Sequence, residues 1–225
     1  MSPSAPVVAP VVAFDLDGTI TRHDTLRLVL RRGLRRFPSR PWAALTLPGA
    51  FRAARRDIAQ RGAFKAAALN VLFGGRSRAW LEAFAADFAH FALEHEVKPA
   101  ARAAIDRHRA AGHMLVLATA SPELWARPIG DALGFDAVLA TRLAWCGGRF
   151  SGRLDGLNLL HQAKRRAIEA FLAGHAGGAP LHAGYTDHHH DLPMLLLARH
   201  PVAVDPTPEL AAEAAARNIP VQHWR

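Results

Sequence analysis

Several residue types that would define the class of the protein are rare or missing. The 225 residues include one cysteine, Cys146, so an internal disulfide framework is excluded. No stretch reaches the roughly 18 consecutive apolar residues that a membrane-spanning helix needs. The first residues lack the positive segment of a secretory signal, and the apolar run after them ends in acidic residues. We therefore expect a cytoplasmic protein, and peripheral attachment to a membrane surface stays open.

Acidic residues are scarce relative to basic ones, and the formal net charge is +9. Lysine occurs only at Lys65, Lys98 and Lys164, so most of the positive charge comes from arginine. A basic surface attracts anions such as nucleic acids, anionic lipids and phosphorylated metabolites. A general bias toward arginine explains much of this charge. We expect a phosphorylated small molecule as the partner, with an anionic membrane surface as the alternative and no nucleic acid. The oligomeric state is not predicted.

The apolar pattern predicts an α/β protein. Residues 7–14 form a nearly continuous β-branched apolar run, which is typical of a parallel strand buried on both faces. Residues 25–96 show helical periodicity, and strand and helix alternate again from Pro99. This order predicts a doubly wound parallel sheet of the Rossmann-like kind. We expect a catalytic core at 1–22 and 97–225, with an all-helical cap at 23–96 inserted after the first strand.

Two aspartates, Asp15 and Asp17, follow the first predicted strand directly, and Gly18 comes next. Residues two apart on an extended chain point the same way, so both carboxylates can serve one site. Gly18 permits a sharp turn where a side chain would crowd a ligand. One carboxylate can attack phosphorus while the other gives and takes the proton of the leaving group. The pair therefore predicts phosphoryl transfer.

Two later positions offer groups for a phosphate. Thr119 ends a predicted buried strand, and Ser121 is expected to cap the helix that follows. The Thr119 hydroxyl and backbone donors such as that of Ala120 can hold a phosphate oxygen at this helix start, the alternative being a plain cap without a ligand. Lys164 begins a later predicted helix, where its ammonium can offset the charge between carboxylate and phosphate. Taken alone, Lys164 would be interpreted as a surface lysine.

Asp187 and Asp191 follow the predicted strand 181–185 and are four residues apart, so they can share one face of a turn. Mg²⁺ prefers carboxylate oxygens, retained waters and substrate phosphate. We therefore expect Mg²⁺ as the cofactor, held by Asp15, Asp187 and the backbone carbonyl of Asp17.

Three consecutive histidines, His188, His189 and His190, lie between these aspartates and raise zinc as an alternative. Three consecutive residues of a regular structure cannot all point at one ion, and zinc-binding histidines are usually spaced along the chain. The sequence therefore favours magnesium at the carboxylates and assigns no role to the histidines.

The motifs, in this order on successive strand ends, resemble those of the haloacid dehalogenase superfamily of phosphatases over essentially the whole chain. The sequence DLDGT at 15–19 resembles its first motif, LATAS at 117–121 its second, Lys164 its third, and DHHHDLPML at 187–195 its fourth. The helical insert is similar to the cap of the phosphoserine-phosphatase-like branch. The resemblance implies these roles: Asp15 as nucleophile and metal ligand, Asp17 as acid and base, Thr119 and Lys164 as phosphate-binding residues, and Asp187 as a metal ligand supported by Asp191.

Two places depart from that pattern. His188 stands where the family often has a serine directly after the metal-binding aspartate. The segment 156–161, before Lys164, lacks the expected Gly/Cys-rich composition. Neither place involves the nucleophile, and both concern the identity of the substrate.

Hydrolysis of a phosphomonoester through an aspartyl-phosphate intermediate is the leading hypothesis. A catalytically silent protein that binds anions or nucleic acid through its basic face is an alternative of another class, and the intact set of carboxylates, Thr119 and Lys164 argues against it. Dehalogenation needs neither an acid at Asp17 nor a metal at Asp187, so both residues disfavour it.

The cap is expected to choose the substrate. A small phosphometabolite such as phosphoserine is favoured, with Asp24 as a contact at the cap entrance. The alternative is a lipid phosphate at the membrane surface, because arginines alternate with large apolar residues over 26–37 and apolar residues follow over 42–51. The insert also resembles, mostly in composition, that of the bacterial phosphatidylglycerophosphate phosphatases, including its FGGRS segment at 73–77.

Overall fold

A six-stranded parallel sheet forms the centre of the protein. The computed structural model describes residues 9–36, 58–175 and 180–225. The strand order is β3-β2-β1-β6-β7-β8, and each strand is parallel to its neighbours in this sheet. The strands are β1 (Val11–Phe14), β2 (Met114–Pro122), β3 (Ala137–Thr141), β6 (Leu181–Thr186), β7 (Ala198–Val204) and β8 (Val221–Gln222). The predicted fold class, a doubly wound parallel sheet, is confirmed.

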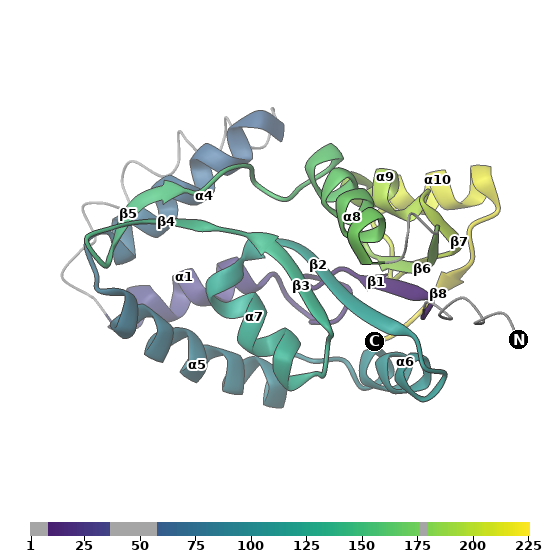
Figure 1. Ribbon diagram of the computed structural model, residues 1–225, viewed down its shortest axis with the longest axis horizontal. Helices are drawn as coiled ribbons and strands as arrows, with labels where there is room; N and C mark the ends of the chain where they lie inside the picture. Colours follow the sequence, from purple (N-terminus) through teal and green to yellow (C-terminus); the bar gives the residue numbers. More distant parts are fainter. Residues whose placement is uncertain (1–8, 37–57, 176–179) are drawn as a thin grey trace, which may run out of the picture.

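Helices cover both faces of this sheet (Figure 1). The 3₁₀ turn η1 and helices α8, α9 and α10 lie toward one face, and α6 and α7 lie toward the other. Their bounds are α6 (Pro99–Ala110), α7 (Glu123–Ala132), α8 (Gln162–His175), η1 (His189–Asp191), α9 (Leu192–Leu195) and α10 (Pro208–Arg217).

Strand β1 is buried on both faces, which explains its unbroken apolar sequence. Val12 and Phe14 belong to the large cluster that includes residues of α6 and α7. Val11 and Ala13 point the other way and belong to the cluster that includes Ile168 of α8. All four β1 residues are at most 2% exposed. A central parallel strand with helices on each side requires this pattern, and it places the residues after Phe14 at the middle of the sheet edge.

Four described helices separate β1 from β2: α6 directly precedes β2, and before it come α1 (Thr25–Arg36), α4 (Ile58–Phe73) and α5 (Arg78–His95). Helix α5 begins with Ser77 as its N-cap, whose hydroxyl accepts from the backbone N–H of Trp80. Within the described residues, the segment 25–96 is helical as expected, and residues 37–57 lie outside them. The limits 1–22, 23–96 and 97–225 for cap and core stay a prediction.

An antiparallel hairpin that the periodicity did not predict follows β3. It consists of β4 (Leu143–Cys146) and β5 (Arg149–Leu154), and β5 packs on α4. Gly147 and Gly148 form the two-residue turn, and both have positive φ, of 53° and 71°. A Gly-Gly pair between apolar runs is a hairpin signal, so the sequence carried this information.

Two predicted boundaries were wrong. The alternation of strand and helix after Pro99 predicts a helix over 192–198, but helix α9 ends at Leu195, because Ala198 already pairs with Leu181 as the first residue of β7. The first strand, predicted from residue 7, begins at Val11 within the described residues, because residues 9 and 10 are not part of it; residues 7 and 8 lie outside the described ranges.

Candidate active site

Side chains from three neighbouring strands meet at one edge of the sheet. Asp15 directly follows β1, and Asp187 directly follows β6, the neighbour of β1. The hydroxyl of Thr19 lies 3.3 Å from Asp15 Oδ2 and 3.3 Å from Asp187 Oδ1. Two carboxylates that are far apart in the sequence therefore face one common donor, at the strand ends where parallel sheets bind ligands.

Gly18 allows these two segments to come close. Its φ is +81°, a left-handed conformation that glycine adopts at little cost. A Cβ atom at this position would lie 2.2 Å from Asp187 Oδ2, well inside van der Waals contact. The carbonyl oxygen of Gly18 accepts a hydrogen bond from Lys98, which also pairs with Asp205 at 2.9 Å. The absence of a side chain at residue 18 is thus a packing requirement of the site.

Lys164 places a buried ammonium between two carboxylates. Its Nζ lies 2.6 Å from Asp15 Oδ1 and 2.5 Å from Asp191 Oδ2, and its side chain is 1% exposed. Thr186 also donates to Asp191 Oδ2, at 3.1 Å. Burial alone would lower the pKa of Lys164, but the two carboxylates raise it above its ordinary value. Lys164 is therefore a fixed positive charge and not a surface lysine.

The carboxylates outnumber the positive charge beside them. Burial raises the pKa of Asp15 well above its ordinary value, against the opposing effect of Lys164, and the neighbouring aspartates raise it further. Burial and Asp191 raise the pKa of Asp187 to about 7. Without a further cation, these groups share protons to limit their mutual repulsion.

Asp17 is held by a chain of hydrogen bonds that starts at a buried tryptophan. Trp125 Nε1 donates to Thr25 Oγ1 at 3.0 Å, the hydroxyls of Thr25 and Ser121 lie 2.8 Å apart, and Ser121 Oγ donates to Asp17 Oδ2 at 2.6 Å. Because Ser121 uses its one hydrogen on Asp17, the Thr25 hydroxyl donates to Ser121 Oγ. The other Asp17 oxygen accepts from the backbone N–H of Thr25 at 2.6 Å.

The environment of Asp17 favours its protonated form. Burial raises its pKa, the charge of Asp24 raises it too, and the hydrogen bonds from Ser121 and Thr25 lower it. The expectation that Ser121 caps α7 is wrong: strand β2 continues to Pro122, which occupies the N-cap position without a side-chain cap bond. Ser121 instead donates to a catalytic candidate, which its position two residues after Thr119 did not reveal.

Thr119 and Ala120 lie in a buried part of β2 where the pairing with β3 changes register. The Thr119 hydroxyl accepts from the backbone N–H of Ser121 at 3.0 Å. The carbonyl oxygen of Ala120 accepts from Lys65 and, at 2.7 Å, from Thr141. The structure thus places both predicted phosphate-binding residues at the same sheet edge as Asp15.

Lys65 is a residue that the sequence did not single out. It belongs to α4, yet its ammonium bonds to the carbonyl oxygen of Ala120 and to Asn158 Oδ1. Burial lowers its pKa to about 8, against the opposing effect of Asp17 and Asp24. A rare lysine in an arginine-rich chain was the available signal, but the contact of Lys65 with β2 depends on the tertiary packing of α4.

Asp24 lies at the border of this group. Its side chain is 46% exposed, and its Oδ1 accepts from the backbone N–H of Arg27 at 3.0 Å in the first turn of α1. Its charge contributes to the raised pKa of Asp17. Asp24 therefore neighbours the site but already serves its own helix.

The side chains of the three consecutive histidines, His188, His189 and His190, converge, which the sequence did not predict. One ring nitrogen from each lies within 4.8 Å of the others, so the argument that consecutive histidines cannot converge is wrong for this turn. The turn η1 is irregular, and an irregular backbone does not follow the side-chain directions of a strand or an α-helix.

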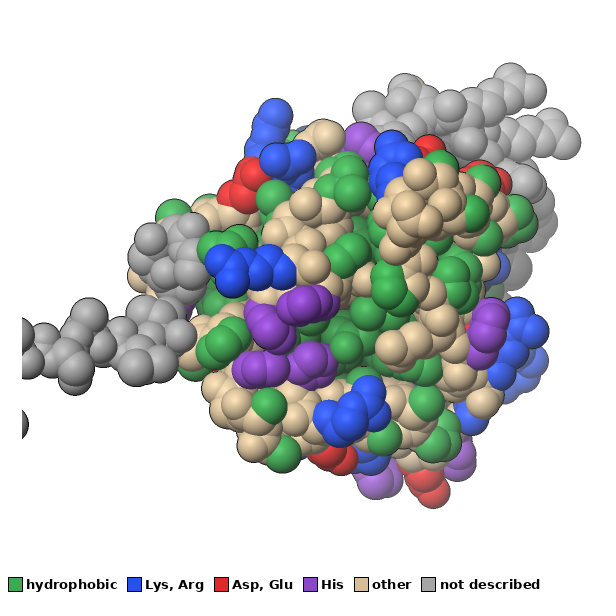
Figure 2. Space-filling model, turned by 90° about the vertical axis from the view of Figure 1, so that its right-hand side faces the viewer, with side chains coloured by type: hydrophobic (Ala, Val, Ile, Leu, Met, Phe, Trp, Pro, Cys, Tyr) green, Lys and Arg blue, Asp and Glu red, His purple; other side chains and the backbone are tan. Residues whose placement is uncertain are grey.

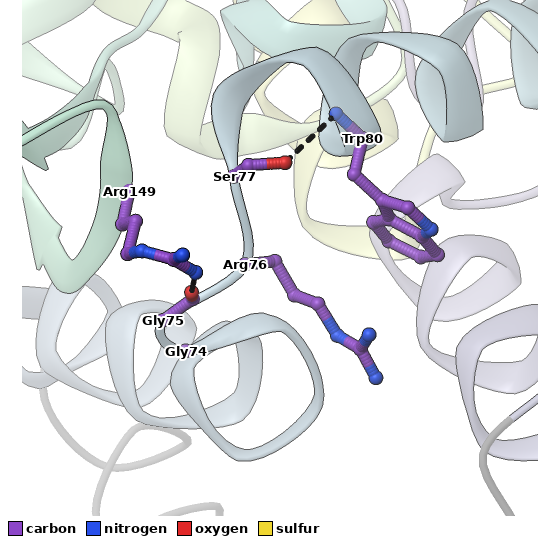
Figure 3. Close-up of a pocket in the computed structure, with 6 residues that line it drawn as sticks. All are labelled: Gly74, Gly75, Arg76, Ser77, Trp80 and Arg149. Atoms are coloured by element: carbon purple, nitrogen blue, oxygen red, sulfur yellow. Dashed lines mark hydrogen bonds between the residues drawn. The ribbon is translucent and has the colours of Figure 1, made fainter.

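A cavity of about 390 Å³ lies where α4 connects to α5 (Figure 3). It includes part of the FGGRS segment, and Arg149 donates to the carbonyl oxygen of Gly75 at 2.9 Å across it. Its lining residues are Gly74, Gly75, Arg76, Ser77, Trp80 and Arg149. None of the predicted site residues lines this cavity, so the chemistry is not assigned to it.

Comparison with known proteins agrees with this geometry. Residues 12–196 match the haloacid dehalogenase-like hydrolase family. The chain belongs to this family. The match begins within β1 and ends after α9, so it spans every acidic residue of the site. The predicted family and the predicted enzyme class, a hydrolase of the superfamily that contains the phosphatases, are confirmed.

Individual haloacid dehalogenase relatives cover most of the chain. The CicA protein of Caulobacter vibrioides is 35% identical over 192 residues, which are 84% of this chain and 82% of that protein. A Bordetella pertussis protein of unknown function has a TM-score of 0.81 at 24% identity, covering 96% of this chain and 98% of the other. A phosphoserine phosphatase structure, described as an analogue of its phospho-aspartyl intermediate, has a TM-score of 0.67 at 16% identity, with coverages of 97% and 94%. The two structures share the fold.

Proposed function

We propose that this hydrolase cleaves phosphomonoesters by forming a covalent phosphoryl intermediate on Asp15. The observation that carries the proposal is the position of the Asp15 carboxylate, 2.6 Å from the Lys164 ammonium and two residues before Asp17, whose pKa is raised by burial. A carboxylate attacks phosphorus only if the negative charges of the two groups are offset. Lys164 supplies one such charge from a fixed, buried position.

Asp17 is the proposed general acid and base. A group whose pKa is raised holds a proton at the pH where other carboxyls have lost theirs. Protonated Asp17 can give this proton to the leaving oxygen when the P–O bond breaks. The resulting carboxylate can then take a proton from the water that attacks phosphorus and returns Asp15 to its free form. The hydrogen bonds from Ser121 and Thr25 keep the Asp17 carboxyl in one orientation through both steps.

The donor set fits Mg²⁺, which we propose as the cofactor. Asp15, Asp187 and the backbone carbonyl of Asp17 are hard oxygen donors, the type that Mg²⁺ prefers. Burial, together with the neighbouring carboxylates, raises the pKa values of Asp15 and Asp187, and a bound cation would offset both the burial and the repulsion of these charges. When bound, Mg²⁺ would neutralise part of the phosphate charge.

A small phosphometabolite such as phosphoserine is the proposed substrate. Thr119, Ala120, Gly18 and Lys164 are the proposed phosphate-binding residues. Lys65 supports a small substrate with a second anionic group, because it brings a buried ammonium from α4 to the carbonyl of Ala120. The neighbouring phosphoserine phosphatase fold and the charge of Asp24 beside Asp17 are compatible with an amino group on the same substrate.

Hydrolysis of p-nitrophenyl phosphate with and without Mg²⁺ tests the reaction, followed by a panel of phosphometabolites. We expect turnover that requires Mg²⁺ and stops in excess chelator. Full activity in chelator, or activation by zinc alone, would contradict the proposed cofactor.

A lipid phosphate is the second candidate, because the outer face of α1 is rich in arginine. Arg27, Arg31 and Arg35 are exposed, and the buried face presents Val29 and Gly33. In the described part of the chain, no helix combines the length and apolarity needed to cross a membrane. Residues 42–51, on which this hypothesis also depends, lie outside the described residues.

Liposomes separate the two substrates. Sedimentation with anionic but not neutral liposomes, together with turnover of phosphatidylglycerophosphate above that of phosphoserine, would favour the lipid. If the protein neither sediments with liposomes nor hydrolyses the lipid phosphate, the small phosphometabolite is the supported substrate class.

A further inference from the structure

The turn after β6 concentrates imidazole groups in a small volume. The ring centroids of His188, His189 and His190 are 4.0–4.5 Å apart. One ring nitrogen of each histidine lies within 4.8 Å of the other two, close enough for a single metal ion. The proposed magnesium chemistry uses none of the three rings.

Two of these rings carry buried nitrogens that no described group satisfies. His189 Nδ1 and His190 Nε2 are shielded from solvent and have no hydrogen-bond partner among the described residues. A buried polar atom without a partner costs free energy, and such an atom in a folded protein requires an explanation. A neutral imidazole offers one nitrogen lone pair, which is the group that binds a metal ion.

A carboxylate stands on the open side of the cluster. Glu209 Oε2, in the first turn of α10, lies 4.0 Å from His189 Nδ1. This distance is too long for a hydrogen bond. An ion about 2.0–2.2 Å from each atom would fit between them after a small movement of the exposed Glu209 side chain.

We propose that His188, His189, His190 and Glu209 form a second metal site, for a late first-row divalent ion such as Zn²⁺, Co²⁺ or Ni²⁺. Imidazole donors select these ions, whereas Mg²⁺ prefers the oxygens of the aspartates. His189 and His190 are the ligands already placed. His188 Nδ1 accepts a 3.2 Å hydrogen bond from the backbone N–H of His190, and its ring must turn away from that contact to bind.

Neighbouring charges both oppose and favour a cation at this site. The guanidinium of Arg61 in α4 acts on the rings of His188 and His190 and disfavours a cation there. The carboxylates of Asp191 and Glu209 act on His188 with the opposite sign. Loss of Glu209 should therefore weaken metal binding by removing both a ligand and a compensating charge.

A cobalt titration of protein without a histidine tag tests this site. Excess Mg²⁺ is present throughout to occupy the carboxylates. We expect one equivalent of Co²⁺ to produce visible absorption bands of nitrogen coordination, and Zn²⁺ to displace it with a rise in Tm. His189→Ala and Glu209→Gln should each weaken binding, the former by more than about tenfold.

The opposite edge of the sheet, where the strands begin, provides a matched control; Figure 2 shows histidine side chains gathered on the side of the molecule that it presents. A second group of histidines lies near the starts of β2, β6 and β7, where the rings of His113 and His182 are 4.5 Å apart and those of His182 and His200 are 5.0 Å apart. His182→Ala removes a clustered histidine there and should leave the cobalt bands and the affinity unchanged. Circular dichroism establishes that each variant is folded.

Asp187→Asn distinguishes the histidine site from the proposed magnesium site. We expect this variant to keep the cobalt bands even when phosphatase activity is lost, so failure of the proposed function does not affect this test. No cobalt bands in the wild-type protein would overturn the second site. Bands that disappear in Asp187→Asn but persist in His189→Ala, or that His182→Ala removes equally, would also overturn it.

Discussion

Replacing Asp17 by asparagine tests the proposed acid and base in the most detail. The amide keeps the shape of the carboxyl and can still accept the N–H of Thr25, which lies 2.6 Å from Oδ1. On the other side, an amide nitrogen would meet Ser121 Oγ, so the hydroxyl must reorient to accept. A net hydrogen bond is worth about 1 kcal/mol, so the fold should survive. General acid–base catalysis typically contributes about 10²–10⁴ in rate, or about 2.7–5.4 kcal/mol at 1.36 kcal/mol per decade.

The leaving group distinguishes an acid from a structural residue. An alkyl phosphate needs a proton on its leaving oxygen, whereas p-nitrophenolate leaves readily without one. We expect Asp17→Asn to slow alkyl phosphate turnover by the full two to four decades and p-nitrophenyl phosphate turnover by much less. Steady-state kcat is measured on both substrates, with circular dichroism as the control for folding. Equal losses on the two substrates would refute the role of Asp17 as the proton donor.

Three further predictions follow from the same geometry. Gly18→Ala should destabilise the protein by about 1–3 kcal/mol and remove activity, because the new Cβ would collide with Asp187. Gly112→Ala is the control: Gly112 also has a positive φ, but no atom lies within 4 Å of its Cβ position, so this variant should keep activity. Equal losses of stability in denaturant and of rate in the two variants would contradict the packing argument. Ser121→Ala removes a hydrogen bond that lowers the pKa of Asp17. The alkaline limb of the kcat–pH profile for an alkyl phosphate, where Asp17 loses the proton that it donates, should therefore move to higher pH, and an unmoved limb would leave Ser121 a structural residue. The pKa of Asp187 in the folded protein, about 7, lies above its ordinary value of 3.8, so the metal-free folded protein binds this proton more tightly than the unfolded chain does. The Tm of the metal-free protein should therefore fall as the pH rises from about 4 to about 7, and Mg²⁺ should reduce the fall. A Tm that rises with pH over this window would contradict the prediction.

Motif order predicted the positions of the site residues because parallel strands end at the same sheet edge. Asp15 and Asp187 could be expected to meet once β1 and β6 were assigned to one sheet, and Lys164 once its helix was placed. A glycine after Asp17 already indicated a close approach. These predictions need only local patterns and the topology of the sheet.

The contacts that tune the site depend on packing across the fold. The bond from Lys65 to Ala120 joins residues 55 apart in the sequence, and no local pattern states which core segment α4 touches. Serine is a residue type that often caps helices, but β2 extends to Pro122, and the Ser121 hydroxyl donates to Asp17 instead. The convergence of His188–His190 depends on the irregular turn η1, which periodicity does not describe.

Detection of a phosphoryl group on Asp15 tests the central claim most directly. The protein would be mixed with Mg²⁺ and a phosphomonoester that it hydrolyses, quenched rapidly in acid, digested and analysed by mass spectrometry. The Asp15→Asn variant would be treated in parallel. We predict an acid-stable, alkali-labile phosphoryl adduct on the peptide that contains Asp15, and neither adduct nor turnover in the folded variant. An adduct on another residue, or wild-type turnover by Asp15→Asn, would contradict the account.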